Sequence, residues 1–166
     1  VYNHRYSNIR QFNIGGFMKG KDFTATRMFV NANKFIEAYH KILQPICKMS
    51  GLPPMAVDIL MFIANNPEQN TANDICRCRG LKSGIVSVHI ERLVSEGLIE
   101  RREVPGDRRK TRLVCTEKAT EIIAKGHKLQ RSFAKKLTEG MSKEYLKVFH
   151  DCLATIGKNI DEIRNA

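Results

Sequence analysis

The sequence predicts a mainly α-helical protein with one small β-hairpin. Apolar residues recur at helical spacing along most of the chain from residue 26 onward. The exception is 98–115, where two short runs of β-branched or alternating residues flank a Pro-Gly turn signal. Hydrophobic residues make up 42% of the 166 positions, which is enough for a folded core. The length favours one domain, or one domain with an added dimerisation part.

Two helices are expected before residue 66. The first runs from about 26 to 49, and its apolar face steps by three or four through Phe35, Tyr39, Ile42, Ile46 and Met49. Pro53 and Pro54 suit the first turn of the second helix, which ends at Asn65-Asn66-Pro67. Its expected core consists of Val57, Ile59, Leu60, Phe62 and Ile63.

A pair of helices joined by a tight turn is expected between residues 71 and 97. Thr71 is a good N-cap for the shorter helix, with Asp74 in its first turn, and Gly80 supplies the C-terminal turn. The longer helix runs from about Ser83 to Glu96 and ends at Gly97. Its inward stripe consists of Val86, Ile90, Leu93 and Val94.

The remaining elements are the hairpin and two further helices. The predicted strands, 98–104 and 111–115, are joined by a basic loop over 105–110. Thr116 is expected to cap a fifth helix, with an apolar face of Ile122, Ile123, Leu129, Phe133 and Leu137. Ser142 is expected to cap a sixth, whose apolar positions are Tyr145, Phe149, Cys152, Ile156, Ile160 and Ile163.

This order of elements predicts a winged helix-turn-helix, in which the second helix of the pair enters the DNA major groove and the hairpin is the wing. Small, partly polar residues lie opposite or beside the inward stripe of that helix, and we expect base contacts from Ser83, Gly84, Ser87 and Val88. His89 and Arg92 complete the predicted DNA contacts of the helix, and Arg77 and Arg79 are expected to position phosphates. The alternative is that Ser83 only caps the helix and the serines face solvent.

Charge supports a polyanionic partner. The formal net charge is +11 and the pI is about 9.6. The wing tip concentrates Arg108, Arg109 and Lys110, and we expect it to lie in a minor groove, where negative potential attracts arginine.

Residues 80–123, "GLKSGIVSVHIERLVSEGLIERREVPGDRRKTRLVCTEKATEII", resemble the core of the MarR-type (multiple-antibiotic-resistance regulator) transcription factors. The resemblance lies in the helix ending "IERLVSEGLIER", the wing signature Asp107-Arg108-Arg109 and the "TEK" that starts the next helix. Lys82, Val88 and Ala119 depart from the family pattern, so base preference is not transferred. The resemblance implies a homodimer on a palindromic operator, usually a repressor released by a small ligand, an oxidant or a metal, with Asp107 orienting a neighbouring arginine.

The predicted organisation has three parts. Residues 1–22 form an N-terminal extension; Met18 is a candidate natural start, in which case residues 1–17 derive from an expression vector. Residues 51–116 form the DNA-binding winged helix-turn-helix, and 23–50 with 117–166 form a helical dimerisation region. The cleft between these parts is the expected site of an unidentified small-molecule effector. The longest uncharged apolar run, "ILMFIA" at 59–64, is too short to span a bilayer, and a cytoplasmic protein is expected.

Other functions are less well supported by the residues. No catalytic signature, metal or cofactor is expected, since Cys76 and Cys78 point to opposite sides of a short helix. Redox sensing by one of the five cysteines, and a thiol enzyme built on one, stay open. The main rival is a nonspecific architectural or RNA-binding winged helix, which would bind with strong salt dependence and little sequence preference.

Overall fold

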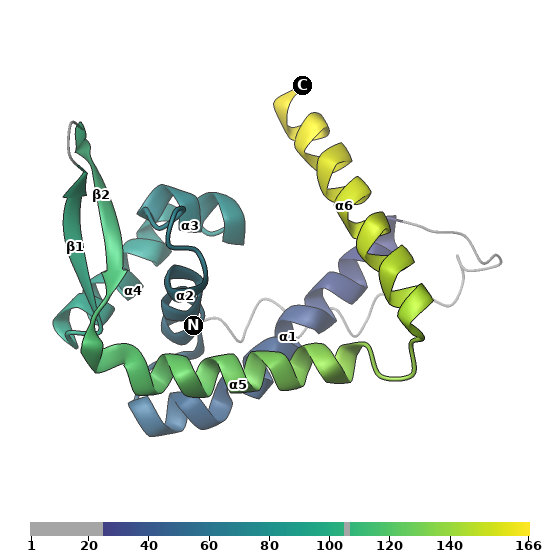
Figure 1. Ribbon diagram of the computed structural model, residues 1–166. Helices are drawn as coiled ribbons and strands as arrows, with labels where there is room; N and C mark the ends of the chain where they lie inside the picture. Colours follow the sequence, from purple (N-terminus) through teal and green to yellow (C-terminus); the bar gives the residue numbers. More distant parts are fainter. Residues whose placement is uncertain (1–24, 105–106) are drawn as a thin grey trace. The chain divides into compact units, whose positions relative to one another are not determined.

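The computed structural model describes residues 25–104 and 107–166. They belong to two compact units, Val1–Glu37 and Ala38–Ala166, whose boundary lies inside the first helix. The helices are α1 (Ala25–Ser50), α2 (Pro54–Asn65), α3 (Ala72–Arg79), α4 (Ser83–Ser95), α5 (Thr120–Leu137) and α6 (Lys143–Asn165). A 3-10 turn, Glu117–Ala119, precedes α5, and the strands are β1 (Ile99–Val104) and β2 (Asp107–Cys115) (Figure 1). The predicted fold class is confirmed, while the division into a reading head and a dimerisation region stays a prediction.

The turn between α3 and α4 forms as its local sequence predicts. The Asp74 N–H donates to the Thr71 hydroxyl (3.2 Å), and the Thr71 N–H donates to the Asp74 carboxylate (3.1 Å), which is a capping box. Gly80 ends α3 with φ of 63°, in the left-handed region that favours glycine. The turn thus joins α3 directly to α4, and the two helices pack against each other.

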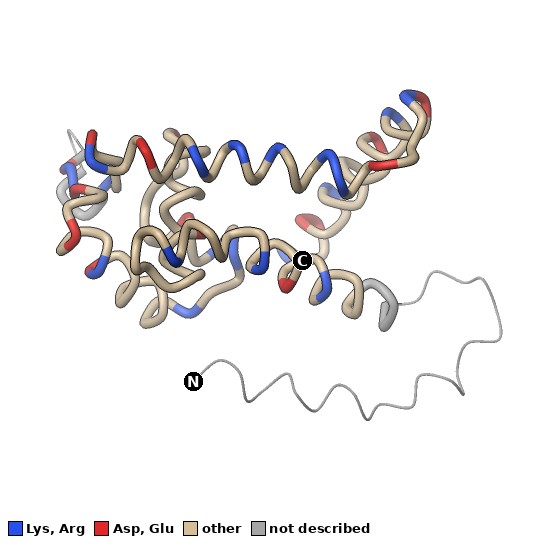
Figure 2. Tube along the Cα trace, turned by 90° about the horizontal axis from the view of Figure 1, so that it is seen from below, with Lys and Arg blue, Asp and Glu red and all other residues tan. Residues whose placement is uncertain are grey.

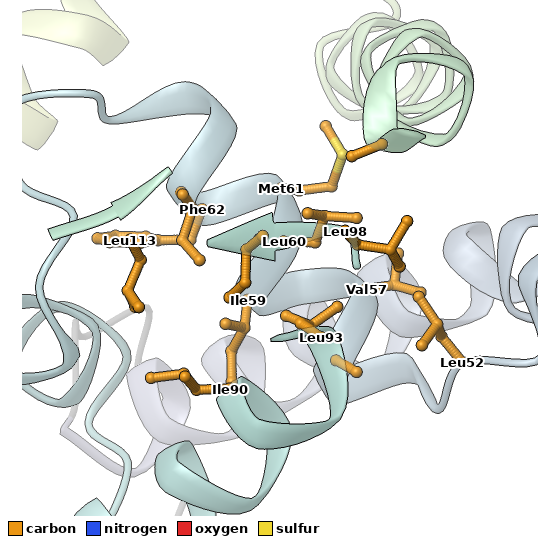
Figure 3. Close-up of a cluster of buried hydrophobic side chains, with 14 of the residues drawn as sticks. Leu52, Val57, Ile59, Leu60, Met61, Phe62, Ile90, Leu93, Leu98 and Leu113 are labelled. Carbon is orange, nitrogen blue, oxygen red and sulfur yellow. The ribbon is translucent and has the colours of Figure 1, made fainter. Parts of the chain in front are cut away.

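Helix α2 lies at the centre of the core. All residues from Ala56 to Ile63 are buried, because α4, β2 and α5 each contact this helix. Figure 3 shows side chains from α4 and the hairpin converging on it, among them Ile90, Leu93 and Leu113. The expected core of α2 is confirmed, as is the α4 stripe, where only Val94 is half-buried rather than buried.

The wing differs from its prediction. The strands pair antiparallel from Ile99 opposite Cys115 to Glu103 opposite Thr111, and the register then shifts so that Val104 lies opposite Asp107. Residues 107–110, expected in the loop, therefore belong to β2, and only 105–106, which lie outside the described residues, connect the strands. A two-residue connection is enough to join antiparallel strands, so the pairing extends farther than the apolar pattern suggested.

The start of the fifth helix also differs. The Thr116 hydroxyl donates to the Gly97 carbonyl (2.6 Å) and makes no capping bond. The chain forms the 3-10 turn first, and α5 begins at Thr120. The prediction for the last helix is confirmed, since the Tyr145 N–H donates to the Ser142 hydroxyl (3.2 Å).

Helix α6 has no buried residue in the single chain. Its apolar positions are exposed or half-buried, and Tyr145 and Ile163 are 72% and 76% exposed. Among the described helices, none by itself is long and apolar enough to cross a membrane, although α1 and α2 together, across the bend between them, meet a test of length and composition.

Candidate nucleic-acid interface

The N-terminal half of α4 presents a small, exposed surface. Ser83, Gly84, Ser87 and Val88 are all exposed, and Val88 is 66% exposed, whereas Val86 and Ile90 of the same helix are buried. The predicted orientation of the helix is thus confirmed. No atom lies within 4 Å of the position that a Cβ on Gly84 would take, so the protein's own packing does not require glycine there. What this surface contacts stays a prediction.

Ser83 does not cap the helix. The N-cap residue is Lys82, which makes no side-chain capping bond, and Ser83 is the first residue inside α4. The alternative role for Ser83 as a cap is therefore wrong. Its hydroxyl is left to face outward, together with the unpaired N–H groups that begin any helix.

His89 is half-buried and Arg92 is exposed. Burial, and secondarily Arg92, lowers the pKa of His89, so a neutral imidazole is favoured at physiological pH. The Arg92 guanidinium donates to the Gly51 carbonyl (2.9 Å) and ties α4 to the turn between α1 and α2. Arg92 is thus held by a hydrogen bond within the protein, and a contact with DNA stays a prediction for both residues.

The two α3 arginines pair with acids. Arg77 contacts Asp74 (3.0 Å), and Arg79 contacts Asp58 of α2 (3.1 Å) while lying over the Phe62 ring, 5.2 Å from its centroid. Burial raises the pKa of Asp58, although Arg79 and then His40 oppose the shift. The Arg79 pair, which connects α2 to the end of α3, was not predicted. Its signal in the sequence is the lone acid inside the apolar run 56–64.

The base of the wing is tied to the reading helix. Arg101 of β1 forms an ion pair with Glu91 of α4, and Arg102 pairs with Glu100 along the same strand (2.5 Å). The wing and α4 therefore have a direct polar connection that the sequence pattern did not reveal. Arg108, Arg109 and Lys110 lie in β2 by their backbone, but their side chains and that of Asp107 are outside the described residues, so their predicted roles stay predictions.

A shallow groove of about 470 Å³ lies where β2 meets α5. Its walls are formed by Cys115, Thr116, Glu117, Thr120, Ile123, Ala124 and His127. The His127 ring contacts the Asn65 side chain (2.8 Å), whose amide donates to Gln130 (3.1 Å); Gln130 in turn donates to the Tyr39 hydroxyl (2.7 Å). A hydrogen-bond chain thus connects the groove to α2 and α1.

All five cysteines are free thiols. Burial raises the pKa of Cys115 to about 11 and also raises that of Cys47, so neither is activated as a thiolate. Cys78 and Cys152 are exposed. Within 25–104 and 107–166, no group of three or more His, Cys, Asp or Glu side chains is placed to hold a metal ion.

Comparison with known proteins agrees with this geometry. Residues 50–110 match the model of the MarR family. The chain is 27% identical over 104 residues to the uncharacterized HTH-type transcriptional regulator YdgJ of Bacillus subtilis strain 168, and the match covers 63% of each protein. The chain therefore spans somewhat less than two thirds of that relative.

Two solved structures share the fold. A MarR transcriptional regulator from Methanosarcina mazei Go1 has a TM-score of 0.70 at 15% identity, over 85% of this chain and 94% of its own. A MarR-family regulator from Listeria monocytogenes, solved with a 26mer DNA, has a TM-score of 0.71 at 17% identity, over 86% of this chain and 91% of its own.

The fold is that of a winged helix-turn-helix protein, and residues 50–110, less than half of the chain, match a family to which transcriptional regulators belong. The resemblance to the MarR-type transcription factors seen in the sequence is confirmed by the match over 50–110 and by the shared fold.

Proposed function

We propose that the chain is a homodimeric regulator that binds a palindromic operator in double-stranded DNA and acts as a repressor released by a small ligand or an oxidant. The observation that supports this most directly is the exposed surface of α4, made of Ser83, Gly84, Ser87 and Val88, beside a basic wing. The hydroxyls can hydrogen-bond to base edges, and Val88 can contact a thymine methyl. The relative from Listeria was solved with DNA, which fits the same use of this fold.

The dimer is proposed from the exposed apolar face of α6. Tyr145, Val148, Phe149, Leu153, Ile160 and Ile163 are each at least 41% exposed in the single chain. A contiguous apolar face of this kind is normally covered by a partner, and a second copy covers it symmetrically. The proposal places the protein in the cytoplasm, a reducing compartment that suits its five free thiols.

The effector site is proposed at the groove between β2 and α5. The groove lies where the predicted reading head joins the predicted dimerisation region. The series of hydrogen bonds from His127 to Tyr39 connects it to α2 and α1. A ligand there could change the placement of the reading head. The exposed thiols Cys78 and Cys152 are the alternative sensors if the signal is an oxidant.

The first experiment measures affinity for an operator selected from random duplexes. The operator should be an inverted repeat with half-sites about 10 base pairs apart. Ser87→Ala and Val88→Ala should each lose affinity for it, by about 1–3 kcal/mol where the side chain makes a base contact. Ser95→Ala, at the opposite end of α4, is the matched control and should bind like the parent. Equal affinity for operator and random DNA would favour the architectural or RNA-binding alternative.

The wing is tested by Arg108→Ala and Arg109→Ala, measured singly across a salt series. An arginine inserted in the minor groove should contribute about 1–3 kcal/mol, whereas a solvated one should contribute a few tenths. Parental binding by both variants at every salt concentration contradicts a reading role for the wing.

Sedimentation of the parent should give twice the chain mass of 18.9 kDa, and Leu153→Glu should shift the sedimenting mass toward that of the monomer.

A further inference from the structure

Helix α5 carries a row of cations on its outer side. Lys125, Lys128, Arg131, Lys135 and Lys136 are all exposed, and no acidic residue occurs between positions 122 and 138. Figure 2 shows Lys and Arg positions following one another along α5, the helix that runs across the top of the view. None of the DNA-binding positions predicted above lies on this helix.

The outward orientation of the row is fixed by packing. At about 100° per residue, the five cations occupy an arc of about 140° on the helix. Gly126 and Phe133, which are buried, lie on the other side of the helix, whereas the half-buried Leu129 lies at the edge of the basic arc, beside Lys136. Because Gly126 lies against Met61 of α2, α5 cannot turn its basic side inward without separating from the core.

Four of these cations are uncompensated. Lys125 pairs with Glu121 (2.6 Å), but Lys128, Arg131, Lys135 and Lys136 form no ion pair with any residue that the structure describes. Helix α6 differs, because two of its cations pair with acids on the next turn, Lys158 with Glu162 and Arg164 with Asp161. A solvated helix face usually mixes both signs, so the outer face of α5 has the charge pattern of a surface that meets a polyanion.

We propose that this face of α5 binds double-stranded DNA without regard to sequence, as a second surface in addition to the reading head. The row from residue 125 to 136 is about 16 Å long at 1.5 Å per residue. A duplex carries one phosphate charge per about 1.7 Å of its axis, so several phosphates lie within reach of four unpaired cations. An anionic membrane surface fits less well, because it requires several apolar side chains that insert beside the cations, and Leu137 is the only large apolar side chain of α5 that is exposed.

The test uses a four-fold variant, Lys128→Gln with Arg131→Gln, Lys135→Gln and Lys136→Gln. Glutamine keeps the helix propensity of lysine, so the helix should persist. The matched control, Lys143→Gln with Lys147→Gln, Lys158→Gln and Arg164→Gln, removes the same four charges from α6. Affinity for a random-sequence duplex of 60 base pairs is measured for the full-length parent and both variants across a salt series.

The α5 variant should lose at least tenfold in affinity at low salt. Its plot of log affinity against log salt should flatten by about 0.9 for each phosphate that the variant no longer neutralises, thus by about 2–4. The α6 control should change by less than one. Equal slopes in both variants would show that only net charge matters and would overturn the proposal. It would also be overturned if the α5 variant kept parental DNA binding but lost binding to vesicles containing anionic lipid.

The result does not depend on operator recognition. A random duplex contains no operator, and Ser87→Ala with Val88→Ala should leave its salt slope unchanged. Failure of the α5 proposal and failure of the proposed function therefore appear in different variants. Operator duplexes with short and long flanks then show which duplex α5 contacts. If α5 contacts the duplex that carries the operator, long flanks should raise the affinity and short flanks should not. If α5 contacts a second duplex, added competitor duplex should reduce binding.

Discussion

Replacing Gly126 by alanine should destabilise the protein although it removes a glycine from the middle of a helix. Gly126 is buried on α5, and a Cβ built there would overlap the Met61 sulfur and lie 2.8 Å from its Cε and 3.3 Å from its Cγ. Figure 3 shows Met61 extending from α2 toward α5, and this side chain has no exposed surface. The new methyl group can be accommodated only if Met61 or the helix moves.

Two opposing effects decide the magnitude. Alanine is favoured over glycine inside a helix by about 1 kcal/mol. Overpacking a filled core costs about 1–3 kcal/mol. Since the contact involves Cγ as well as the mobile end of Met61, the side chain cannot escape by turning its last bond alone. We therefore expect a net loss of up to about 2 kcal/mol, measured by urea denaturation of the parent and the variant.

Two further variants separate these effects. Gly84→Ala, on α4, has no atom within 4 Å of the new Cβ and should be neutral or stabilising. Met61→Ala should cost less in the Gly126→Ala background than in the parent, with a coupling of about 0.5–3 kcal/mol. The reasoning is refuted if Gly126→Ala is more stable than the parent and shows no coupling to Met61.

Three other perturbations follow from the same contacts. Thr71→Ala removes half of the capping box of α3 and should lower the free energy of unfolding by about 1–2 kcal/mol, whereas Thr120→Ala, which makes no capping bond, is the control. Burial raises the pKa of Asp58, so the stability that it contributes is fully present below its unfolded pKa of about 4 and is lost as pH rises through the folded value. Relative to Asp58→Asn, the parent should therefore become less stable as the pH rises from the unfolded pKa of Asp58 to its folded pKa. A difference in unfolding free energy that does not change with pH would contradict this. Burial raises the pKa of Cys115 to about 11. Brief alkylation at pH 8, followed by peptide mass spectrometry, should therefore show that the exposed Cys78 and Cys152 are modified before Cys115. Equal labelling of Cys115 would show that its burial is transient.

Contacts that span many residues were harder to predict. The guanidinium of Arg92 donates to the carbonyl of Gly51, 41 positions earlier, a contact that was not predicted and that leaves the expected contact with DNA untested. Thr116 was expected to cap a helix, yet it bonds to Gly97, 19 positions earlier. In both cases the side chain donates to a backbone carbonyl that is distant in the sequence, and for Thr116 this bond replaces the predicted cap. Such competition depends on which backbone groups the fold brings close, and spacing along the chain does not reveal it.

Local patterns by themselves determined the helices, the α3 cap, the turn at Gly80 and the outward surface of α4, because each depends on residues within one or two turns of one another. The same is true of the family resemblance, which lies in a continuous stretch. Only the tertiary structure decided that β2 begins at Asp107, that Asp58 is buried beside Arg79, and that the cations of α5 face away from the core. Strand pairing, burial of a charge and the orientation of a whole helix are each decided by what packs against the element, and those neighbours are distant in the sequence.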